Sequence, residues 1–347
     1  MSKQVTWLLP VKNGMPYLPE TLASIEAQTY CNWEVLAWDN GSTDRTVEEL
    51  HKWIPSRLPG RVIAGQPLSL GNSLAEMVKQ CETEFCARID ADDVNVPERL
   101  EQQVAFLLAH PEVAVVGSQV NRLDKHGVNH GPYTPWPVHH HDIVFFMLAS
   151  NGIAHPTVSF RRSAVLQVGN YRDLLGGAED YDLWLRVAID HKLANFPAPL
   201  LHYRVHDKSC TQIAYSRKES KDRLADQWDE CVCKIAPLLY GCLESETRLL
   251  RKRRHPCAIR LLYQIAQHLQ HSQNCKLVDI LKSEFFFIAA RRLVSLRDVI
   301  SLLALLALQP HRTSGDFFTK VFENSAWGGS SRSEAKMIKS LVDKAQS

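Results

Sequence analysis

The sequence predicts an α/β fold, with a mostly parallel sheet and flanking helices, followed by an α-helical C-terminal region. Two observations predict it. In the first part of the chain, short apolar segments alternate with amphipathic helical segments, which is typical of a parallel sheet with helical crossovers. From about Tyr215 onward, glycine and strand-forming residues thin out and leucines recur at helical spacing. We therefore divide the chain into a first domain, 1–212, and a helical region, 213–347.

The composition is that of a globular protein of about two domains. The 347 residues are 45% hydrophobic and 22% charged, and the formal net charge of +2 gives no reason to expect nucleic acid as a partner. The nine cysteines include no C-x-x-C pair, which favours reduced thiols over a disulfide framework or a zinc site. We expect a cytoplasmic location, because the first apolar segment is too short for a signal peptide and no uncharged run could span a bilayer.

The first 120 residues repeat a strand followed by a helix. Val5–Val11 is a continuous run of strand-forming apolar residues, and Pro16 opens the helix that follows it. The same alternation predicts strands at 33–38, 61–64, 84–87 and 113–117, and helices at 45–53, 74–80 and 98–110. The pattern then loosens, leaving a loop at 124–141, strands at 157–160 and 200–205, and an acidic helix start at Glu179.

Three carboxylates follow the fourth strand of this repeat. Asp90, Asp92 and Asp93 lie where the strand ends, and ligands of open α/β sheets bind at the carboxyl ends of strands. Acids this close repel one another, so the segment favours a divalent cation, and oxygen ligands suit Mg²⁺ or Mn²⁺. Such an ion can in turn hold a diphosphate. The alternative is an acidic approach to the next helix, with Asp93 or Asn95 near its N-cap.

Three more loops are expected at the same edge of the sheet. They are Pro10–Asn13, Asp39–Asp44 and Gly71–Asn72, and together with the carboxylates they outline a site of nucleotide size. The Asp39 carboxylate can accept a hydrogen bond from a base N–H or a ribose hydroxyl. The chain has neither Gly-x-Gly-x-x-Gly nor a Gly-Lys-Ser/Thr loop, so the site is neither the usual dinucleotide fold nor a P-loop.

Five motifs, in this order, resemble the family-2 inverting glycosyltransferases of the GT-A fold, of the bacterial surface-glycan type. They are Val-Lys-Asn-Gly at 11–14, Trp-Asp-Asn-Gly-Ser-Thr-Asp at 38–44, Asp-Ala-Asp-Asp at 90–93, Glu-Asp at 179–180 and Tyr-Arg-Val-His at 203–206. The resemblance covers about residues 3–212. Two positions depart from the family pattern. Lys12 stands where the family usually has an uncharged residue, and the segment from Gly71 lacks the common Ala-Arg-Asn ending.

The resemblance implies a role for each motif. Residues 1–120 would bind the nucleotide sugar and residues 121–212 the acceptor. Asp92 would be the chief ligand of the Mn²⁺ or Mg²⁺ ion, with Asp90 and His206 as further ligands, and Asp180 would be the general base. The residues that would bind the nucleotide sugar, with Asp39 on a uracil ring, are Pro10, Val11, Asn13, Asp39, Asn40, Gly71, Arg88, Asp90, Ala91 and Asp92.

The chemistry of glycosyl transfer calls for these residue types. Negative charge builds on the leaving diphosphate, and a cation held by carboxylates neutralises it. The acceptor hydroxyl is a poor nucleophile, so a carboxylate opposite the leaving group must take its proton. Asp180 comes from a separate element and is free to do so, with Glu179 or Asp182 as alternatives. Asp180 could instead be a first-turn acid that only favours the helix dipole.

We expect an inverting, metal-assisted glycosyltransferase that moves a sugar, from a UDP-sugar or a similar donor, to a hydroxyl of a glycan or lipid-linked acceptor. Surface polysaccharide biosynthesis is the expected context. Two alternatives remain open. A nucleotidyltransferase would also use strand-end carboxylates, but it normally needs a glycine-rich, basic loop after its first strand. A non-catalytic module that binds sugar nucleotides would have no need of Glu179 and Asp180.

The helical region carries basic runs near apolar runs. Arg251–Arg254 and Arg291–Arg292 are basic, whereas Phe285–Ala290 and Val299–Leu308 are apolar. These segments either pack into a helical core or attach the protein to an anionic membrane surface. The apolar runs are too short to span a bilayer, so the second interpretation predicts peripheral contact that high salt weakens.

Overall fold

The computed structural model describes residues 3–133, 136–147, 151–174, 177–207, 209 and 218–240. The strands are β1 (Val5–Val11), β2 (Trp33–Asp39), β3 (Gly60–Ala64), β4 (Phe85–Arg88), β5 (Val94–Asn95), β6 (Val113–Leu123), β7 (Asn129–Pro132), β8 (Ser159–Arg161) and β9 (Lys192–Arg204). The helices are α1 (Leu18–Glu26), α2 (Thr46–Trp53), α3 (Leu70–Gln80), α4 (Arg99–Ala109), α5 (His140–Phe146), α6 (Arg162–Gln167), α7 (Glu179–Asp190) and α9 (Lys218–Tyr240), with a 3₁₀ turn η1 (His155–Thr157).

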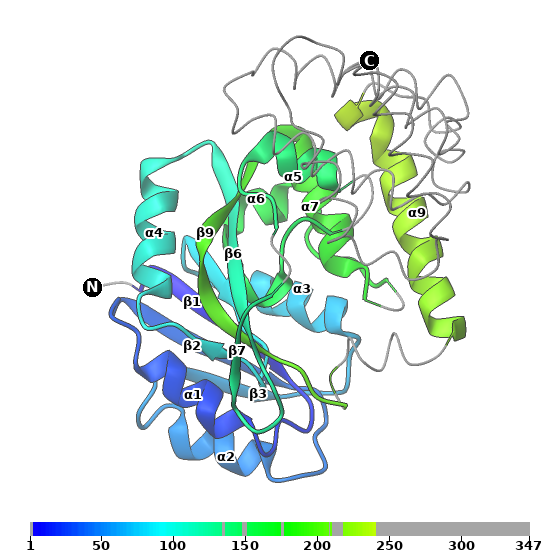
Figure 1. Ribbon diagram of the computed structural model, residues 1–347. Helices are drawn as coiled ribbons and strands as arrows, with labels where there is room; N and C mark the ends of the chain where they lie inside the picture. The colour runs from blue at the N-terminus through cyan, green and yellow to red at the C-terminus, as the bar shows by residue number, and fades with distance from the viewer. Residues whose placement is uncertain are drawn as a thin grey trace, which may run out of the picture. The chain divides into compact units, whose positions relative to one another are not determined.

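The strands form one mixed sheet with helices on its faces (Figure 1). Its order is β3-β2-β1-β4-β8-β6-β9-β5, and β7 pairs with β6. Strand β1 runs parallel to β2 and to β4, and β2 runs parallel to β3. The carboxyl ends of these strands therefore lie at one edge of the sheet, as the alternation of strands and helices predicts.

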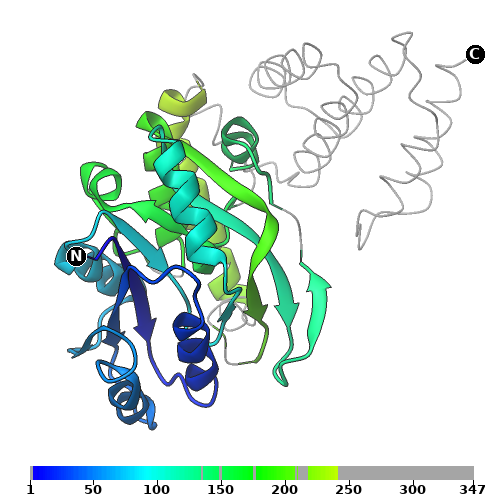
Figure 2. The same cartoon turned by 90° about the vertical axis from the view of Figure 1, so that its left-hand side faces the viewer.

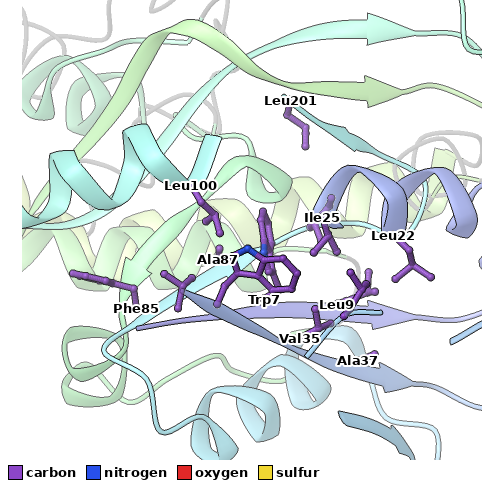
Figure 3. Close-up of a cluster of buried hydrophobic side chains, with 14 of the residues drawn as sticks. Trp7, Leu9, Leu22, Ile25, Val35, Ala37, Phe85, Ala87, Leu100 and Leu201 are labelled. Carbon is purple, nitrogen blue, oxygen red and sulfur yellow. The ribbon is translucent and has the colours of Figure 1, made fainter. Parts of the chain in front are cut away.

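One face of the sheet buries the main hydrophobic cluster. Successive residues of a strand point to opposite faces, so Trp7 and Leu9 of β1 share a face with Val35 of β2. There they pack with α1, α2 and α4, through residues such as Leu22 and Leu100, all within one buried cluster (Figure 3). Helix α3 instead packs against β1 and β2 in company with α6 and α7. Helices therefore cover both faces of these strands, and the loops at the strand ends begin from buried, well-packed residues.

The second half of the sheet differs from the sequence prediction. Strand β8 enters antiparallel between β4 and β6, so β6 is not a direct neighbour of β4. Strands β6 and β9 are longer than predicted and pair in parallel over most of their length (Figure 2). Pro197 and Pro199 argue against a strand in the sequence, but register shifts opposite Ser118 and Gln119 accommodate them. The predicted loop at 124–141 also contains β7 and the start of α5.

Helix α3 begins four residues before the predicted start at Leu74. Ser69 is its N-cap, and the Ser69 side chain accepts a hydrogen bond from the backbone N–H of Asn72. Gly71 therefore lies in the first turn of a helix and not in a loop. A Cβ atom on Gly71 would lie 2.3 Å from the carbonyl oxygen of Arg172, so this glycine permits close packing of the two segments.

Helix α9 lies beside α7, and the Trp228 and Tyr181 rings are 5.2 Å apart (Figure 1). Residues 1–241 form one compact unit that includes α9. The predicted division at 212 stays a prediction. The basic and apolar runs predicted to form a core or a membrane contact lie beyond residue 240, outside the described residues. Among the described helices, none is long and apolar enough to cross a membrane.

Candidate active site

The three strand-end carboxylates converge after β4. Asp90, Asp92 and Asp93 each offer a carboxylate oxygen, and these oxygens lie within 4.8 Å of one another. Asp90 and Asp92 are partly exposed, whereas Asp93 is fully buried. The structure therefore brings together the three carboxylates that the sequence predicts at this strand end.

The electrostatics of this cluster fit a divalent cation. Burial raises the pKa of Asp90, against the opposing effect of Arg88, and the charge of Asp92 raises it further. Burial also raises the pKa of Asp93 well above its usual range, and the charges of Asp92 and Asp90 add to the effect. One buried oxygen of Asp93, Oδ2, has no protein hydrogen-bond partner. Repelling carboxylates with a spare oxygen are suited to Mg²⁺ or Mn²⁺, which prefer oxygen ligands.

The end of β9 closes the cluster from the other side. His206 Nε2 lies 2.8 Å from Asp92 Oδ2, and the His206 ring lies 4.8 Å from that of Tyr17. The Arg204 backbone N–H donates to Asp93 Oδ1 at 2.8 Å, and Arg204 Nε donates to the carbonyl oxygen of Asp92 at 2.8 Å. His206 is thus placed to orient Asp92 or to share a cation with it, and Arg204 holds the loop.

The loops after β1 and β2 hold each other. The Asn13 side-chain oxygen accepts the Thr43 backbone N–H at 2.8 Å. The buried Asp39 carboxylate accepts the backbone N–H groups of Gly41 and Ser42, each at 3.1 Å. Asp39 and Asn13 therefore shape the loop after β2, and their contact with a nucleotide stays a prediction.

The remaining predicted nucleotide residues line the same edge of the sheet. Pro10 and Val11 end β1 level with Trp38 and Asp39. The Asn40 backbone N–H donates to the Val11 carbonyl oxygen at 2.8 Å. Ala91 packs against the main hydrophobic cluster. For Gly71 the structure supplies a packing role, and its contact with a nucleotide also stays a prediction.

Asp180 is a nearly buried carboxylate at the start of α7. Its side chain is 13% exposed. Oδ2 accepts a hydrogen bond from Asn151 Nδ2 and Oδ1 accepts the Tyr181 backbone N–H, each at 2.7 Å. Burial raises the pKa of Asp180 to about 6, although these donors and the charge of Arg88 oppose it. Such a carboxylate is ionised at neutral pH, yet it is a stronger base than an exposed aspartate.

The two alternatives to Asp180 as a base are less suitable. Glu179 is 4% exposed, so a hydroxyl group has little access to it, and burial with the charge of Asp180 raises its pKa to about 7. Asp182 is buried in an ion pair, with Arg186 Nη2 2.6 Å from Asp182 Oδ2. Asp180, whose side chain is 13% exposed, is the more accessible carboxylate, and its role as the base stays a prediction.

His155 and Tyr171 pack beside Asp180. His155 Nδ1 lies 3.9 Å from Asp180 Oδ2, and His155 Nε2 lies 3.0 Å from the Tyr171 hydroxyl. Burial, together with the charge of Arg88, lowers the pKa of His155 well below its usual range. The imidazole is thus neutral and adds no positive charge beside Asp180.

Arg88 pairs with Asp90, and its charge also acts on Asp180. Its side chain is 3% exposed and pairs with Asp90. Burial lowers the pKa of Arg88, but the charges of Asp90, Tyr171, Asp93 and Asp180 outweigh burial and raise it. Two of its buried nitrogens, Nε and Nη1, have no protein hydrogen-bond partner. One buried guanidinium therefore acts on both the carboxylate cluster and Asp180.

Several residues of the site were missed by sequence reasoning. Arg204 lies inside the Tyr-Arg-Val-His motif, so its position beside His206 is a signal that could have found it. Asn151 and Tyr171 stand in segments without any motif that sequence reasoning could use. Their roles depend on contacts between segments 16 to 29 residues apart.

The fold and the two groups of acids define an α/β enzyme that works at the carboxyl edge of its sheet. Residues 6–169 match the family described as Glycosyl transferase family 2. The O-antigen biosynthesis glycosyltransferase WbnJ of Escherichia coli is 30% identical over 225 residues, which cover 62% of this chain and 85% of that protein. The chain therefore belongs to glycosyl transferase family 2. This confirms the predicted glycosyltransferase and decides against the two alternatives, a nucleotidyltransferase and a non-catalytic module.

Solved structures confirm the predicted GT-A fold. S. aureus TarS 1–349 in complex with UDP-GlcNAc has a TM-score of 0.52 at 16% identity, over 87% of this chain and 90% of that one. The mannosyltransferase PcManGT from Pyrobaculum calidifontis, in complex with GDP-Man and Mn²⁺, also has a TM-score of 0.52 at 16% identity, over 100% of this chain and 86% of that one. At this identity the likeness shows the fold alone.

Proposed function

We propose that this glycosyltransferase inverts the anomeric centre and uses a divalent cation to move a sugar from a nucleotide-diphosphate donor to a hydroxyl group. The observation that carries the proposal is that one buried guanidinium, Arg88, pairs with Asp90 and also acts by its charge on Asp180. The cluster of Asp90, Asp92 and Asp93 suits a cation, and Asp180 suits a proton. Glycosyl transfer needs both a neutralised leaving group and a base, and the carboxylates suited to these two tasks both interact with the buried guanidinium of Arg88.

On the donor side, the carboxylates hold charge in place. Asp92 would be the chief ligand of Mn²⁺ or Mg²⁺, with Asp90 and His206 beside it. A bound cation supplies neutralisation of the negative charge on the leaving diphosphate. Arg204 holds the Asp92–Asp93 loop through main-chain contacts, so the carboxylates are oriented before the donor arrives.

On the acceptor side, Asp180 removes the proton of the attacking hydroxyl. Its pKa of about 6 leaves it ionised at neutral pH. A hydroxyl that has lost its proton attacks the anomeric carbon from the face opposite the diphosphate, and a single in-line attack inverts that carbon. Glu179 is less suited to this step because it is almost fully buried, and Asp182 because it is paired with Arg186.

The donor we propose is a UDP-sugar, with Asp39 on the uracil ring and the strand-end loops on the rest of the nucleotide. TarS and PcManGT, which share the fold, are described with UDP-GlcNAc and GDP-Man, so the fold accommodates either nucleotide. The acceptor we propose is a glycan or a lipid-linked glycan in surface polysaccharide biosynthesis, which the name of the relative WbnJ supports. We propose that the protein works in the cytoplasm.

The C-terminal region suggests where the acceptor is met. It carries basic runs at Arg251–Arg254 and Arg291–Arg292, and the second directly follows the apolar segment Phe285–Ala290. We propose peripheral contact of this region with the inner face of the membrane. Basic residues at an anionic surface contribute about 1 kcal/mol each, so salt should weaken the contact. Such contact would bring the enzyme to a lipid-linked acceptor.

A donor screen tests the proposed function. Purified protein is incubated with a panel of UDP- and GDP-sugars, with Mn²⁺, with Mg²⁺ or with excess chelator, and the released nucleotide is measured. We expect release from one donor or a small group, and only with a divalent cation. Full activity in excess chelator would refute the role of the metal. Once an acceptor is found, a product that keeps the anomeric configuration of the donor would refute inversion.

A further inference from the structure

The amide of Asn151 holds the proposed base. Asn151 stands in the segment between α5 and η1, and its Nδ2 donates to Asp180 Oδ2 at 2.7 Å. We propose that Asn151 is a positioning residue, which keeps the Asp180 carboxylate oriented and in its ionised, proton-accepting form. The inference rests on the proposed function, because it assumes that Asp180 is the base.

The orientation of the Asn151 amide follows from its other contact. The Ile153 backbone N–H lies 3.2 Å from Asn151 Oδ1. A backbone N–H can only donate, so the atom that faces it must be the amide oxygen and the NH₂ group must face Asp180. A donor aimed at a carboxylate stabilises its charged form. The contact therefore favours ionised Asp180 and does not merely fill space.

The described residues on either side of residues 148–150 are attached to their surroundings. The Tyr181 hydroxyl donates to the carbonyl oxygen of Met147, which ties the end of α5 to the first turn of α7. Asn195 Nδ2 on β9 donates to the carbonyl oxygen of Gly152 at 2.9 Å. The residue after Asn151 is thus held to the sheet, and the Asn151 amide is itself held between Ile153 and Asp180.

The charged and titratable groups around Asp180 make this donor important. Glu179 on the same helix is a like charge once it ionises, and Tyr171 offers no positive charge. His155 in η1 is neutral and lies 3.9 Å away, too far for a hydrogen bond. Arg88 on β4 favours the charged form, but it is paired with Asp90. Direct hydrogen bonds to the carboxylate come from Asn151 and from the Tyr181 backbone N–H.

The test is the pH profile of turnover with the donor and acceptor found for the wild type. Asn151→Ala removes the donor, so the pKa of Asp180 should rise, and the acidic limb of kcat should move up by about one to two pH units. Asn151→Asp keeps the shape of the side chain but places a second carboxylate against Asp180, so the acidic limb of its kcat profile should move to a still higher pH. KM for the donor should stay near the wild-type value in both. Asn129→Ala, in the exposed hairpin at β7, is the matched control and should keep the wild-type profile.

The outcomes separate this inference from the proposed function. If Asp180→Asn is inactive and the Asn151→Ala profile matches the wild type, Asp180 is the base but Asn151 does not tune it. If Asn151→Ala lowers kcat equally at every pH, the residue is only structural and the proposal is overturned. If Asp180→Asn retains full turnover, the proposed base is wrong and the inference falls with it. Circular dichroism of each variant checks that it is folded. Asn151→Ala and Asn151→Asp each report on the pKa of Asp180, so the test does not depend on a single variant.

Discussion

Glu179→Gln should stabilise the protein, and the gain should grow with pH. The folded protein raises the pKa of Glu179 from 4.5 to about 7, because the side chain is buried beside Asp180. The folded state therefore holds the proton more tightly than the unfolded chain. The stability that this provides is full below pH 4.5 and is lost as the pH rises through about 7.

The size of the effect follows from that shift. Each pH unit between the two pKa values corresponds to about 1.4 kcal/mol, so ionising buried Glu179 costs up to about 3 kcal/mol. Glutamine has nearly the same shape but no charge to bury, and its oxygen can still accept the backbone N–H that lowers the pKa of Glu179. Between pH 5 and pH 8, the advantage of Glu179→Gln should therefore grow by about 2 kcal/mol.

Urea denaturation at pH 5 and pH 8 measures this advantage. The wild type, Glu179→Gln and Glu82→Gln are compared, because Glu82 is exposed and its change removes the same charge from the surface. Glu82→Gln should have the same free energy of unfolding as the wild type at both pH values. The reasoning is refuted if Glu179→Gln gains the same free energy of unfolding at both pH values, or if it is less stable than the wild type at pH 8.

Three further predictions concern the metal, the base and the C-terminal region. Asp92→Ala should abolish transfer and sharply weaken binding of the nucleoside diphosphate in calorimetry, whereas unchanged binding would mean that Asp92 does not hold the cation. Asp180→Asn should lower turnover by about 10²- to 10⁴-fold while donor binding persists; lost binding with unchanged turnover at saturation would make Asp180 a binding residue. The full chain should sediment with anionic liposomes at low salt and not at high salt, and a protein that stays in the supernatant at low salt has a purely structural C-terminal region.

The alternation of strands β1 to β4 with helices and the position of the acidic cluster could be predicted from the sequence. Each strand is a short apolar run, and a polar residue such as Asn13, Asp39 or Asp90 lies at or just after its end. Parallel strands joined by helices place their carboxyl ends together, whatever the details of packing. The early start of α3 escaped this reasoning, because Gly71 looks like a loop residue until Ser69 caps the helix ahead of it.

The second half of the sheet could not be predicted in the same way. Strand β8 has three residues, too few for periodicity to show where it pairs, and it enters between β4 and β6 from far along the chain. Strand β9 contains Pro197 and Pro199, which local rules place outside a sheet. Long-range pairing overrides both signals, because the neighbouring strands supply the hydrogen bonds and the register shifts absorb the prolines.

The sequence by itself determined which acids this protein has and in which loops they stand, because strand ends and turn residues are local features. It therefore determined the carboxylate cluster of Asp90 and Asp92 and the Glu-Asp pair at 179–180. Only the tertiary structure decided how these acids behave. Burial raises the pKa of Asp180 to about 6, and Asn151 and Arg88 reach it from distant segments. The reason is physical: desolvation and hydrogen bonding depend on what surrounds a side chain in space, and neighbours in the sequence do not set those surroundings.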